Sequence, residues 1–268
     1  MPLGKKTLLM GILNVAPDSF SDGGRWNTPR KAVAHAIQMQ EEGADLIDVG
    51  AESTRPGARP VSPREELKRV LPVIEYLSGR LHIPISIDTS KALVAKTAVE
   101  AGAGLINDVT ALSDPEMPSV VAQTKVPIIL MHMRGTPQTM HLYARYKNVI
   151  QEVLAELQVF IKKACAAGVS EGKILIDPGL GFAKRPNDNL VIMRNLSAFK
   201  RLGCPIVIGP SRKSFIGKVI GEEDPGKRLF GTAAAVACGI VGGADIVRIH
   251  DVNAMRHVAV MTDALVRG

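Results

Sequence analysis

Three polar residues stand where apolar runs of the sequence end, and their types suit recognition of a flat ring. Asp88 closes IPISID, Asn107 lies in LIND, and Asp177 closes KILID. A buried carboxylate accepts hydrogen bonds from ring N–H groups, and an amide can both donate and accept. A ligand without those donors would leave a desolvated charge unpaired, so such a set confers specificity. These residues indicate a site for a flat heterocycle with adjacent N–H donors and a carbonyl.

A second set of side chains is cationic and suits a phosphate or diphosphate. It consists of Arg55, Lys213, Arg248 and His250. Arginine forks match phosphate oxygens, although Arg55 could also be a solvated loop charge and His250 a strand-end hydrogen-bond partner. A diphosphate can bring Mg²⁺ with it, since this ion needs only one or two protein oxygens. Asn14 is the first candidate for such a ligand.

The elements that must position these residues alternate along the chain. Short β-branched runs are separated by longer segments of helical period, which is typical of a parallel sheet covered by helices. The runs are LLMGILNV, DLIDVGA, IPISIDT, LINDVTA, PIILMHM, KILIDPG, PIVIGPS and DIVRIHD. Four of them follow a helix that ends at a glycine suited to a left-handed C-cap, in EEGAD, EAGAG, AAGVS and VGGAD.

This count and the length of 268 residues predict an α/β protein, a single (β/α)8 TIM barrel spanning residues 1–268 as one domain. A doubly wound open sheet is the alternative. Each predicted strand turns polar at its carboxyl end, where barrel active sites lie. The strand-end residues are Asn14, Asp48, Asp88, Asn107, His132, Asp177, Ser211, Arg248 and His250. Any one of them could be a satisfied structural group, but together they indicate a site on the C-terminal rim.

The composition of the chain limits the classes of binding partner that we expect. The chain is 46% hydrophobic, which is typical of a soluble globular protein, and its net charge of +7 favours an anionic small molecule. The basic residues are scattered and aromatic residues make up only 4%, so we expect no nucleic acid partner. The apolar stretch at residues 229–243 is too short to span a bilayer, so we expect no membrane partner.

The cysteines and the N-terminus favour a cytoplasmic protein. Cys165, Cys204 and Cys238 are far apart among apolar neighbours, which suggests neither a zinc cluster nor a disulfide framework. KKTLLMGILNVAP has the charge and apolar run of a signal peptide, but Asn14 interrupts the run, and Pro17 follows the small residue at the cleavage position. We therefore predict a first strand there.

Two long segments carry a resemblance to a known family. GILNVAPDSFSDGG and GAESTRPGA resemble the signature segments of the dihydropteroate synthases, enzymes of folate biosynthesis. Further matches follow in order along nearly the whole chain: SIDTSKA, INDVTAL, ILMHMRGTP, LIDPGLGFAK, IGPSRKSFIG and RIHDV. One departure is Ala16, where the family more often has threonine before Pro-Asp-Ser-Phe.

The resemblance implies a transferase reaction. A 6-hydroxymethyl-7,8-dihydropterin diphosphate loses pyrophosphate, and the amine of 4-aminobenzoate attacks the methylene to give 7,8-dihydropteroate. It also implies Mg²⁺ as cofactor, sulfonamides as inhibitors and a homodimer. The helix predicted over LFGTAAAVACGIV either contributes to that interface or is ordinary barrel packing.

The resemblance also implies roles for individual residues. The pterin set is Asp88, Asn107, Met131, Asp177, Gly209, Lys213 and Arg248. The diphosphate set is Asn14, Arg55, Arg248 and His250, with Asn14 as the metal ligand. The 4-aminobenzoate set is Phe20, Thr54, Pro56, Phe182, Lys213 and Ser214. Asp18, Ser19 and Phe20 form a lid, and the catalytic set is Lys213, Asp88, Asp177, Arg248 and His250.

Two alternatives keep the barrel and change the function. One is a pterin-binding methyltransferase module, which resembles this chain at Asp88, Asn107 and Asp177 but needs neither SRKSF nor PDSFSDGG. The other is an inactive scaffold paralogue, which would be expected to have lost a cation or a loop residue. The sequence has both segments and every such residue, so it favours the enzyme.

Overall fold

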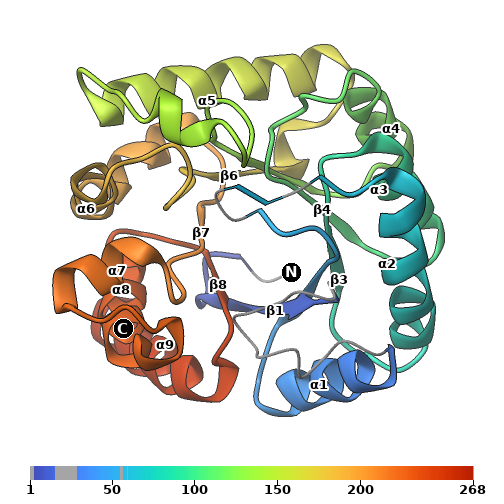
Figure 1. The fold of residues 1–268 in the computed structure, drawn as a ribbon, viewed down its shortest axis with the longest axis horizontal. Helices are drawn as coiled ribbons and strands as arrows, with labels where there is room; N and C mark the ends of the chain where they lie inside the picture. Colours follow the sequence, from blue (N-terminus) through green and yellow to red (C-terminus); the bar gives the residue numbers. More distant parts are fainter. Residues whose placement is uncertain (1–2, 16–28, 55–56, 59, 268) are drawn as a thin grey trace.

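The strands of the protein form a ring in the computed structural model, which describes residues 3–15, 29–54, 57–58 and 60–267 (Figure 1). The strands are β1 (Leu8–Asn14), β2 (Leu46–Gly50), β3 (Ile85–Asp88), β4 (Leu105–Asp108), β5 (Ile128–Met131), β6 (Ile174–Asp177), β7 (Val207–Ile208) and β8 (Ile246–Ile249). They form one parallel eight-stranded sheet in the order β6-β5-β4-β3-β2-β1-β8-β7. Each predicted strand is therefore confirmed.

Two contacts close this sheet into a barrel. Ile176 of β6 forms a parallel bridge with Ile206, just before β7. The Ile176 N–H also donates to the Pro205 carbonyl at 3.0 Å. The first and last strands in the sheet order are thereby joined, as a TIM barrel requires. The barrel prediction is confirmed, and the open doubly wound alternative is wrong.

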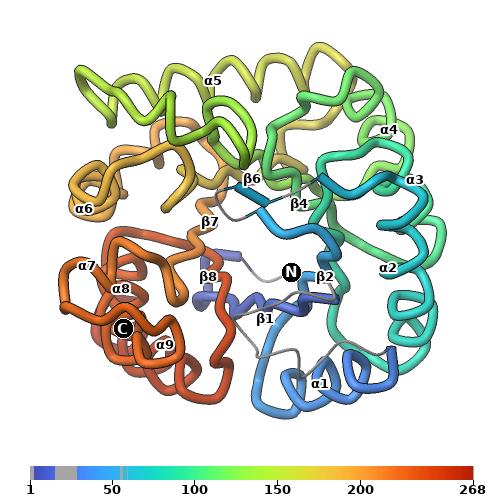
Figure 2. The backbone as a smooth tube through the Cα atoms, viewed as in Figure 1, coloured from blue at the N-terminus to red at the C-terminus, as the bar shows by residue number. Residues whose placement is uncertain are grey.

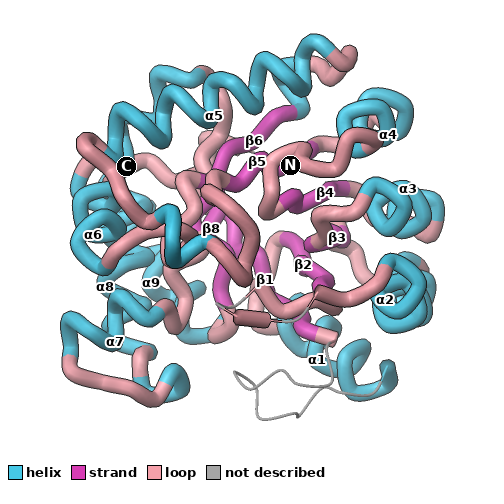
Figure 3. The backbone as a smooth tube through the Cα atoms, turned by 45° about the horizontal axis from the view of Figure 1, so that its top comes forward, coloured by secondary structure: helices cyan, strands magenta, loops and turns pink. Residues whose placement is uncertain are grey.

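Helices surround the barrel on its outside, as the cyan tubes around the magenta strands show in Figure 3. They are α1 (Pro29–Glu41), α2 (Pro63–Ser78), α3 (Ala92–Glu100), α4 (Met117–Thr124), α5 (Val149–Ala166), α6 (Pro186–Arg194), α7 (Ser214–Ile220), α8 (Leu229–Val241) and α9 (Val252–Val266). Short 3₁₀ helices cover Met140–Tyr143, Glu171–Lys173, Leu196–Leu202 and Pro225–Lys227. In the part of the chain that the structure describes, no helix is long and apolar enough to cross a bilayer.

The turns from helix to strand depend on glycine. Gly43, Gly102, Gly168 and Gly243 have φ angles of 101°, 117°, 93° and 93°. Residues with a Cβ rarely adopt this left-handed region, whereas glycine does so without strain. The four predicted glycine C-caps are therefore confirmed, and each returns the chain to the amino-terminal end of the barrel.

Alternation along each strand separates two hydrophobic regions. Side chains that point outward pack beneath the helices in the main core, for example Ile47 and Val49 of β2. Side chains that point inward form a smaller cluster, which we call the apolar floor: Leu8, Met10, Leu46, Leu105, Ile129, Leu175, Val207 and Ile246. Leu3 packs against this cluster. Figure 2 traces the ring of strands that encloses it. The barrel interior is thus filled, not open.

Truncating the apolar floor should destabilise the protein strongly. Leu105→Ala removes a fully buried side chain from a ring whose backbone cannot collapse, so we expect a loss of about 2–5 kcal/mol in the free energy of unfolding. Leu93→Ala makes the same change on α3, where the side chain is 55% exposed, and should cost less than about 0.5 kcal/mol. Urea unfolding followed by circular dichroism measures both, and equal midpoints would contradict the packing described.

Candidate active site

The predicted pterin residues lie on the inner face of the barrel, one step above the apolar floor. Outside β3 they follow a floor residue by two positions, and in β3 Asp88 follows the buried Ser86, so both side chains point inward. Asp48 follows Leu46 and Asn107 follows Leu105, for example. The inward residues of this second layer are Ile12, Asp48, Asp88, Asn107, Met131, Asp177, Gly209 and Arg248. The barrel thus brings together every predicted pterin residue that belongs to a strand or its carboxyl end.

Arg248 links two carboxylates across this layer. Its Nε donates to Asp48 Oδ2 at 2.6 Å, and its Nη2 donates to Asp88 Oδ2 at 2.7 Å. Asn107 Nδ2 donates to the same Asp48 oxygen at 2.9 Å. Asp48 is fully buried, and its Oδ1 has no hydrogen-bond partner. These hydrogen bonds fix the orientations of the Arg248 guanidinium group and of the Asn107 amide inside the barrel.

Asp48 belongs to this polar layer, but the sequence predicts no role in binding for it. It is predicted only as one of the polar residues at the strand ends. The signal that identifies it is its place, two residues after Leu46 on the inward face. Because it holds both Arg248 and Asn107, it determines where two predicted pterin residues point.

Burial controls the protonation of the other two carboxylates. It raises the pKa of Asp88 to about 7, against the opposing charge of Arg248. It also raises the pKa of Asp177 to about 6, although a hydrogen bond from the Gly179 N–H and the charges of Lys213 and Lys184 lower it. Both groups therefore titrate near neutral pH, as functional carboxylates often do.

Asp177 lies at the start of a tight loop that leads to Phe182. The Gly179 N–H donates to Asp177 Oδ1 at 2.7 Å. The Lys213 ammonium lies 3.9 Å from the centre of the Phe182 ring, a cation–π contact between the loops after β6 and β7. The structure thus joins Phe182 and Lys213, both predicted for 4-aminobenzoate, beside the pterin layer.

The other predicted 4-aminobenzoate residues are less tightly placed. Ser214 is exposed and is the first residue of α7, directly after Lys213. Thr54 is half-buried in the loop after β2. Phe20 and Pro56, together with the lid residues Asp18 and Ser19, lie outside the residues that the structure describes.

The loop that carries Thr54 is anchored by a partly buried ion-pair cluster. Lys91, at the start of α3, donates to Glu52 Oε2 in this loop and to Glu66 Oε2 of α2. Glu66 is fully buried, and the second Glu52 oxygen accepts from the Val61 N–H at 3.3 Å. The cluster ties the beginning of the loop to two neighbouring helices.

The predicted diphosphate residues are at the same rim. Asn14 is half-buried at the end of β1, and His250 follows β8. The Ser211 hydroxyl accepts from the His250 backbone N–H at 3.2 Å and also lies 2.9 Å from His250 Nδ1, so it orients the ring. Arg55 is outside the described residues. Among the described residues, no group of three or more His, Cys, Asp or Glu side chains could hold a metal.

His132 does not point to the rim interior as its strand-end position predicts. It follows the inward residue Met131 by one position, so alternation turns its ring outward toward α5. There His132 Nε2 lies 2.9 Å from Glu156 Oε2. The correction has a simple cause: proximity to a strand end does not decide which face a side chain takes.

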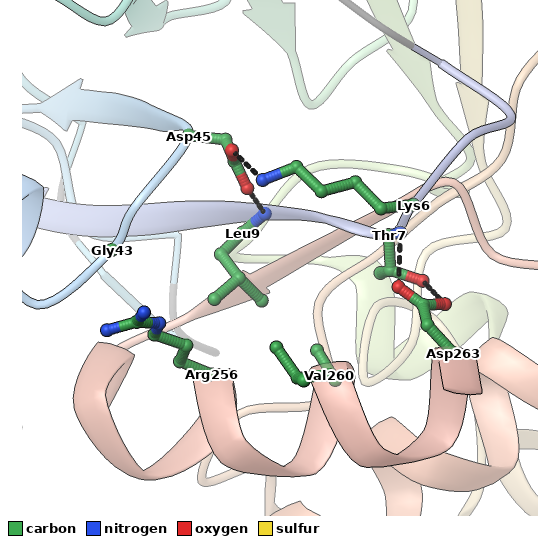
Figure 4. Close-up of a pocket in the computed structure, with 9 residues that line it drawn as sticks. Lys6, Thr7, Leu9, Gly43, Asp45, Arg256, Val260 and Asp263 are labelled. Carbon is green, nitrogen blue, oxygen red and sulfur yellow. Dashed lines mark hydrogen bonds and ion pairs between the residues drawn. The ribbon is translucent and has the colours of Figure 1, made fainter. Parts of the chain in front are cut away.

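A cavity of about 210 Å³ lies at the opposite end of the strands (Figure 4). It is lined by Lys6, Thr7, Leu9, Gly43, Asp45, Arg256, Ala259, Val260 and Asp263. Asp45 accepts from Lys6 Nζ at 2.5 Å and from the Leu9 N–H at 2.9 Å, and Asp263 accepts from the Thr7 N–H at 2.7 Å. Because these carboxylates already join the first strand to its neighbours, the cavity belongs to the barrel framework.

Comparison with known proteins agrees with this geometry. The family description "Pterin binding enzyme" matches residues 10–250. The dihydropteroate synthase of a Synechocystis species is 49% identical over 265 residues, which cover 98% of this chain and 92% of that protein.

Solved structures extend the similarity to the whole fold. The Yersinia pestis dihydropteroate synthase in complex with a sulfonamide drug is 40% identical, with a TM-score of 0.95 over 98% of this chain and 95% of that one. The Xanthomonas albilineans dihydropteroate synthase with 4-aminobenzoic acid is 45% identical, with a TM-score of 0.91 over 97% and 93%. Family, sequence and fold agree along nearly the full length, and the chain therefore belongs to the dihydropteroate synthases, the pterin-binding transferases of folate biosynthesis.

Proposed function

We propose that the polar layer above the apolar floor binds the ring of 6-hydroxymethyl-7,8-dihydropterin diphosphate. The observation that carries this proposal is the convergence of Asp88, Asn107 and Asp177 inside the barrel, where water is largely excluded. The Gly179 N–H donates to Asp177 Oδ1, so we assign Oδ2 as the acceptor for a ring N–H of the pterin. Met131 and Gly209 are the walls, and Arg248 and Lys213 complete the set. A substrate with adjacent N–H donors would hold both carboxylates in their ionised forms.

The cationic residues of the rim are assigned to the diphosphate. Arg248 reaches across the layer, and His250 is oriented by Ser211. The bond between the pterin methylene and the diphosphate oxygen breaks, and its electron pair leaves with pyrophosphate. Cations near that oxygen stabilise the developing negative charge, while the carboxylates beneath the ring favour a positively charged methylene. We assign Arg55 to the same pocket.

The second half of the reaction takes place beside Phe182 and Lys213. We propose that the 4-aminobenzoate ring lies against these side chains, with Ser214, Thr54, Phe20 and Pro56 completing its pocket. Its amine nitrogen forms the bond to the methylene and loses one proton to solvent. Asp18, Ser19 and Phe20 are proposed as the lid over this pocket. A sulfonamide that mimics 4-aminobenzoate would compete here.

We propose that Mg²⁺ enters with the diphosphate and that the Asn14 amide oxygen is its ligand from the protein. Asn14 is half-buried at the rim, and a neutral amide oxygen is a donor that Mg²⁺ accepts beside phosphate oxygens and water. When bound, the ion would neutralise charge on the leaving diphosphate.

We also propose a cytoplasmic homodimer. The three cysteines are free thiols, as is typical of proteins in a reducing compartment. Apolar side chains are exposed where α7 ends and α8 begins: Val219 at 61%, Ile220 at 49% and Phe230 at 87%. Exposed apolar patches of this kind mark interfaces, so we assign the contact between two copies to this surface.

The activity assay combines purified protein, dihydropterin diphosphate, 4-aminobenzoate and Mg²⁺, with dihydropteroate as the product measured. Formation that requires both substrates and is suppressed by a sulfonamide supports the proposal. Tight pterin binding without product would instead favour the methyltransferase or scaffold alternative.

Removal of the Lys213 ammonium should weaken binding of both substrates. We expect Lys213→Ala to lower kcat/KM about 100-fold, because the substitution removes both the positive charge that acts on Asp177 and the cation–π contact with Phe182. Lys218→Ala removes an exposed lysine of α7, the helix that follows Lys213, and should leave kcat/KM unchanged. Steady-state kinetics with each substrate varied measure the effect, and equal values for the two variants would refute the role of Lys213.

Loss of the Asn14 amide should change the metal requirement. EDTA is expected to abolish product formation, and Asn14→Ala should raise the Mg²⁺ concentration for half-maximal rate about 10-fold. Asn253→Ala, an exposed change on α9, should keep the wild-type requirement. Titration of the rate with Mg²⁺ separates the cases, and an unaltered curve for Asn14→Ala would argue against this ligand.

A charge placed at the α7–α8 surface should separate the dimer. We expect the wild-type mass in sedimentation equilibrium to be about twice the 28.6 kDa of one chain, and Phe230→Glu to halve it. Leu93→Glu places the same charge on α3 at a side chain that is 55% exposed, and should leave the mass unchanged. A monomeric wild-type protein would exclude the proposed interface.

A further inference from the structure

We propose that Lys184 is a positioning residue of this site: its ammonium group fixes the loop 179–184 against the end of β5 and is a counter-charge behind Asp177. The inference rests on the proposed roles of Asp177 and Phe182. Lys184 itself is assigned to neither substrate, and it acts through these two residues.

The Lys184 ammonium group is buried and its hydrogen-bond capacity is used. Nζ lies 2.9 Å from His132 Nδ1 and 3.0 Å from the Phe182 carbonyl, with the His132 carbonyl at 3.4 Å. A buried ammonium is stable only when acceptors replace its water, and these contacts provide them. The group therefore connects the end of β5 to the loop after β6.

The His132 ring is held in one orientation and protonation state. Burial and the charge of Lys184 lower the pKa of His132 to about 4, so the ring is neutral. Since Lys184 donates to Nδ1, the ring proton is on Nε2 and is donated to Glu156 at 2.9 Å. Arg134 donates to the same carboxylate, with Nε 3.0 Å from Oε1. The orientation of His132 Nδ1, the acceptor for Lys184, is therefore fixed by the hydrogen bond between Nε2 and Glu156 on the other side of the ring.

The loop 179–184 has little freedom to move away from β5. A Cβ on Gly179 would lie 1.9 Å from the His132 carbonyl oxygen, and the φ of Gly179 is +73°. Ala183 also has a positive φ, of 47°. Lys184 therefore holds the Phe182 carbonyl in a loop already pressed against the strand, and the Phe182 ring is presented to Lys213 at 3.9 Å.

The charge of Lys184 also acts on Asp177. The charged or titratable groups that face Lys184 are Asp177 of β6, Glu156 of α5, Asp188 of α6, Arg134 of the loop after β5, and the neutral His132. Burial lowers the pKa of Lys184 to about 7, and Asp177 opposes this shift. In return, the positive charges of Lys213, Lys184 and Arg248 lower the pKa of Asp177, which burial raises to about 6. Without Lys184, the pKa of Asp177 would rise further.

The test compares Lys184→Met with Lys162→Met, the same change at an exposed lysine of α5. Binding of dihydropterin diphosphate, without 4-aminobenzoate, is measured by calorimetry between about pH 5 and pH 8. Wild-type affinity should fall in two steps, as pH drops through the pKa of Asp88 near 7 and then through that of Asp177 near 6, because each protonation removes an acceptor. In Lys184→Met the midpoint of the Asp177 step should move up by about one pH unit, and in Lys162→Met both steps should stay in place.

Kinetics supply a second readout. In Lys184→Met the KM for 4-aminobenzoate should rise about 10-fold, because the Phe182 carbonyl loses a charged donor and the ring is released. Lys184→Arg keeps the charge but not the shape, so it should keep the wild-type midpoint while raising this KM. It also preserves the test if Lys184→Met does not fold, since a shifted midpoint in Lys184→Arg would overturn the proposal.

A further variant separates this inference from the function it rests on. If Asp177→Asn binds the pterin as tightly as wild type at every pH, the assignment of Asp177 fails and the inference with it. If Asp177→Asn loses pterin binding while Lys184→Met and Lys162→Met behave alike, the site assignment stands and the role of Lys184 is wrong.

Discussion

Side-chain alternation in a closed parallel barrel is the constraint on which the rest of the structure depends. Closure through Ile176 and Ile206 means that every second side chain of every strand must point into one shared interior. Near the amino ends these side chains are apolar, apart from Ser86 of β3, and fill the space. Two residues later they become polar, at the same height in most strands, so the floor and the site are successive layers of one arrangement.

Burial of charged side chains inside the barrel is energetically costly, and the residues of the polar layer compensate this cost by pairing with one another. Asp48 is fully buried, and an isolated charge there would be strongly destabilising. Arg248 pairs with it and with Asp88, while Asn107 adds a hydrogen bond to the same Asp48 oxygen. Two carboxylates share one guanidinium, which explains why burial still dominates the pKa of Asp88. The protonation state of the layer is therefore open to change by whatever binds there.

Much of the fold and part of the site can be predicted from the sequence because they depend on local patterns. The eight strands, the glycine C-caps and the inward strand-end residues follow from alternation and turn chemistry. The contacts of Lys184 cannot be predicted in this way, since they depend on how the loop after β6 folds back over β5. Similarly, the link between Arg248 and Asp48 joins residues distant in sequence, and no motif spacing encodes it.

Alternation also explains why polar strand-end residues divide into two groups with different tasks. Outward-facing polar residues at either end of the strands bond to the main chain or to neighbouring elements. Asp45 accepts from Leu9, Asp245 from the Ile206 N–H at 2.8 Å, and Asp108 from the Leu112 N–H at 2.7 Å. His132 belongs to this group, since its ring is used by Lys184 and Glu156. A one-residue change of register would exchange the groups, placing framework residues in the barrel interior and the residues proposed for the substrates under the helices. The main core opposes that exchange, because the same shift would place buried carboxylates such as Asp48 among its apolar side chains, so the packing of the barrel fixes the position of its chemistry.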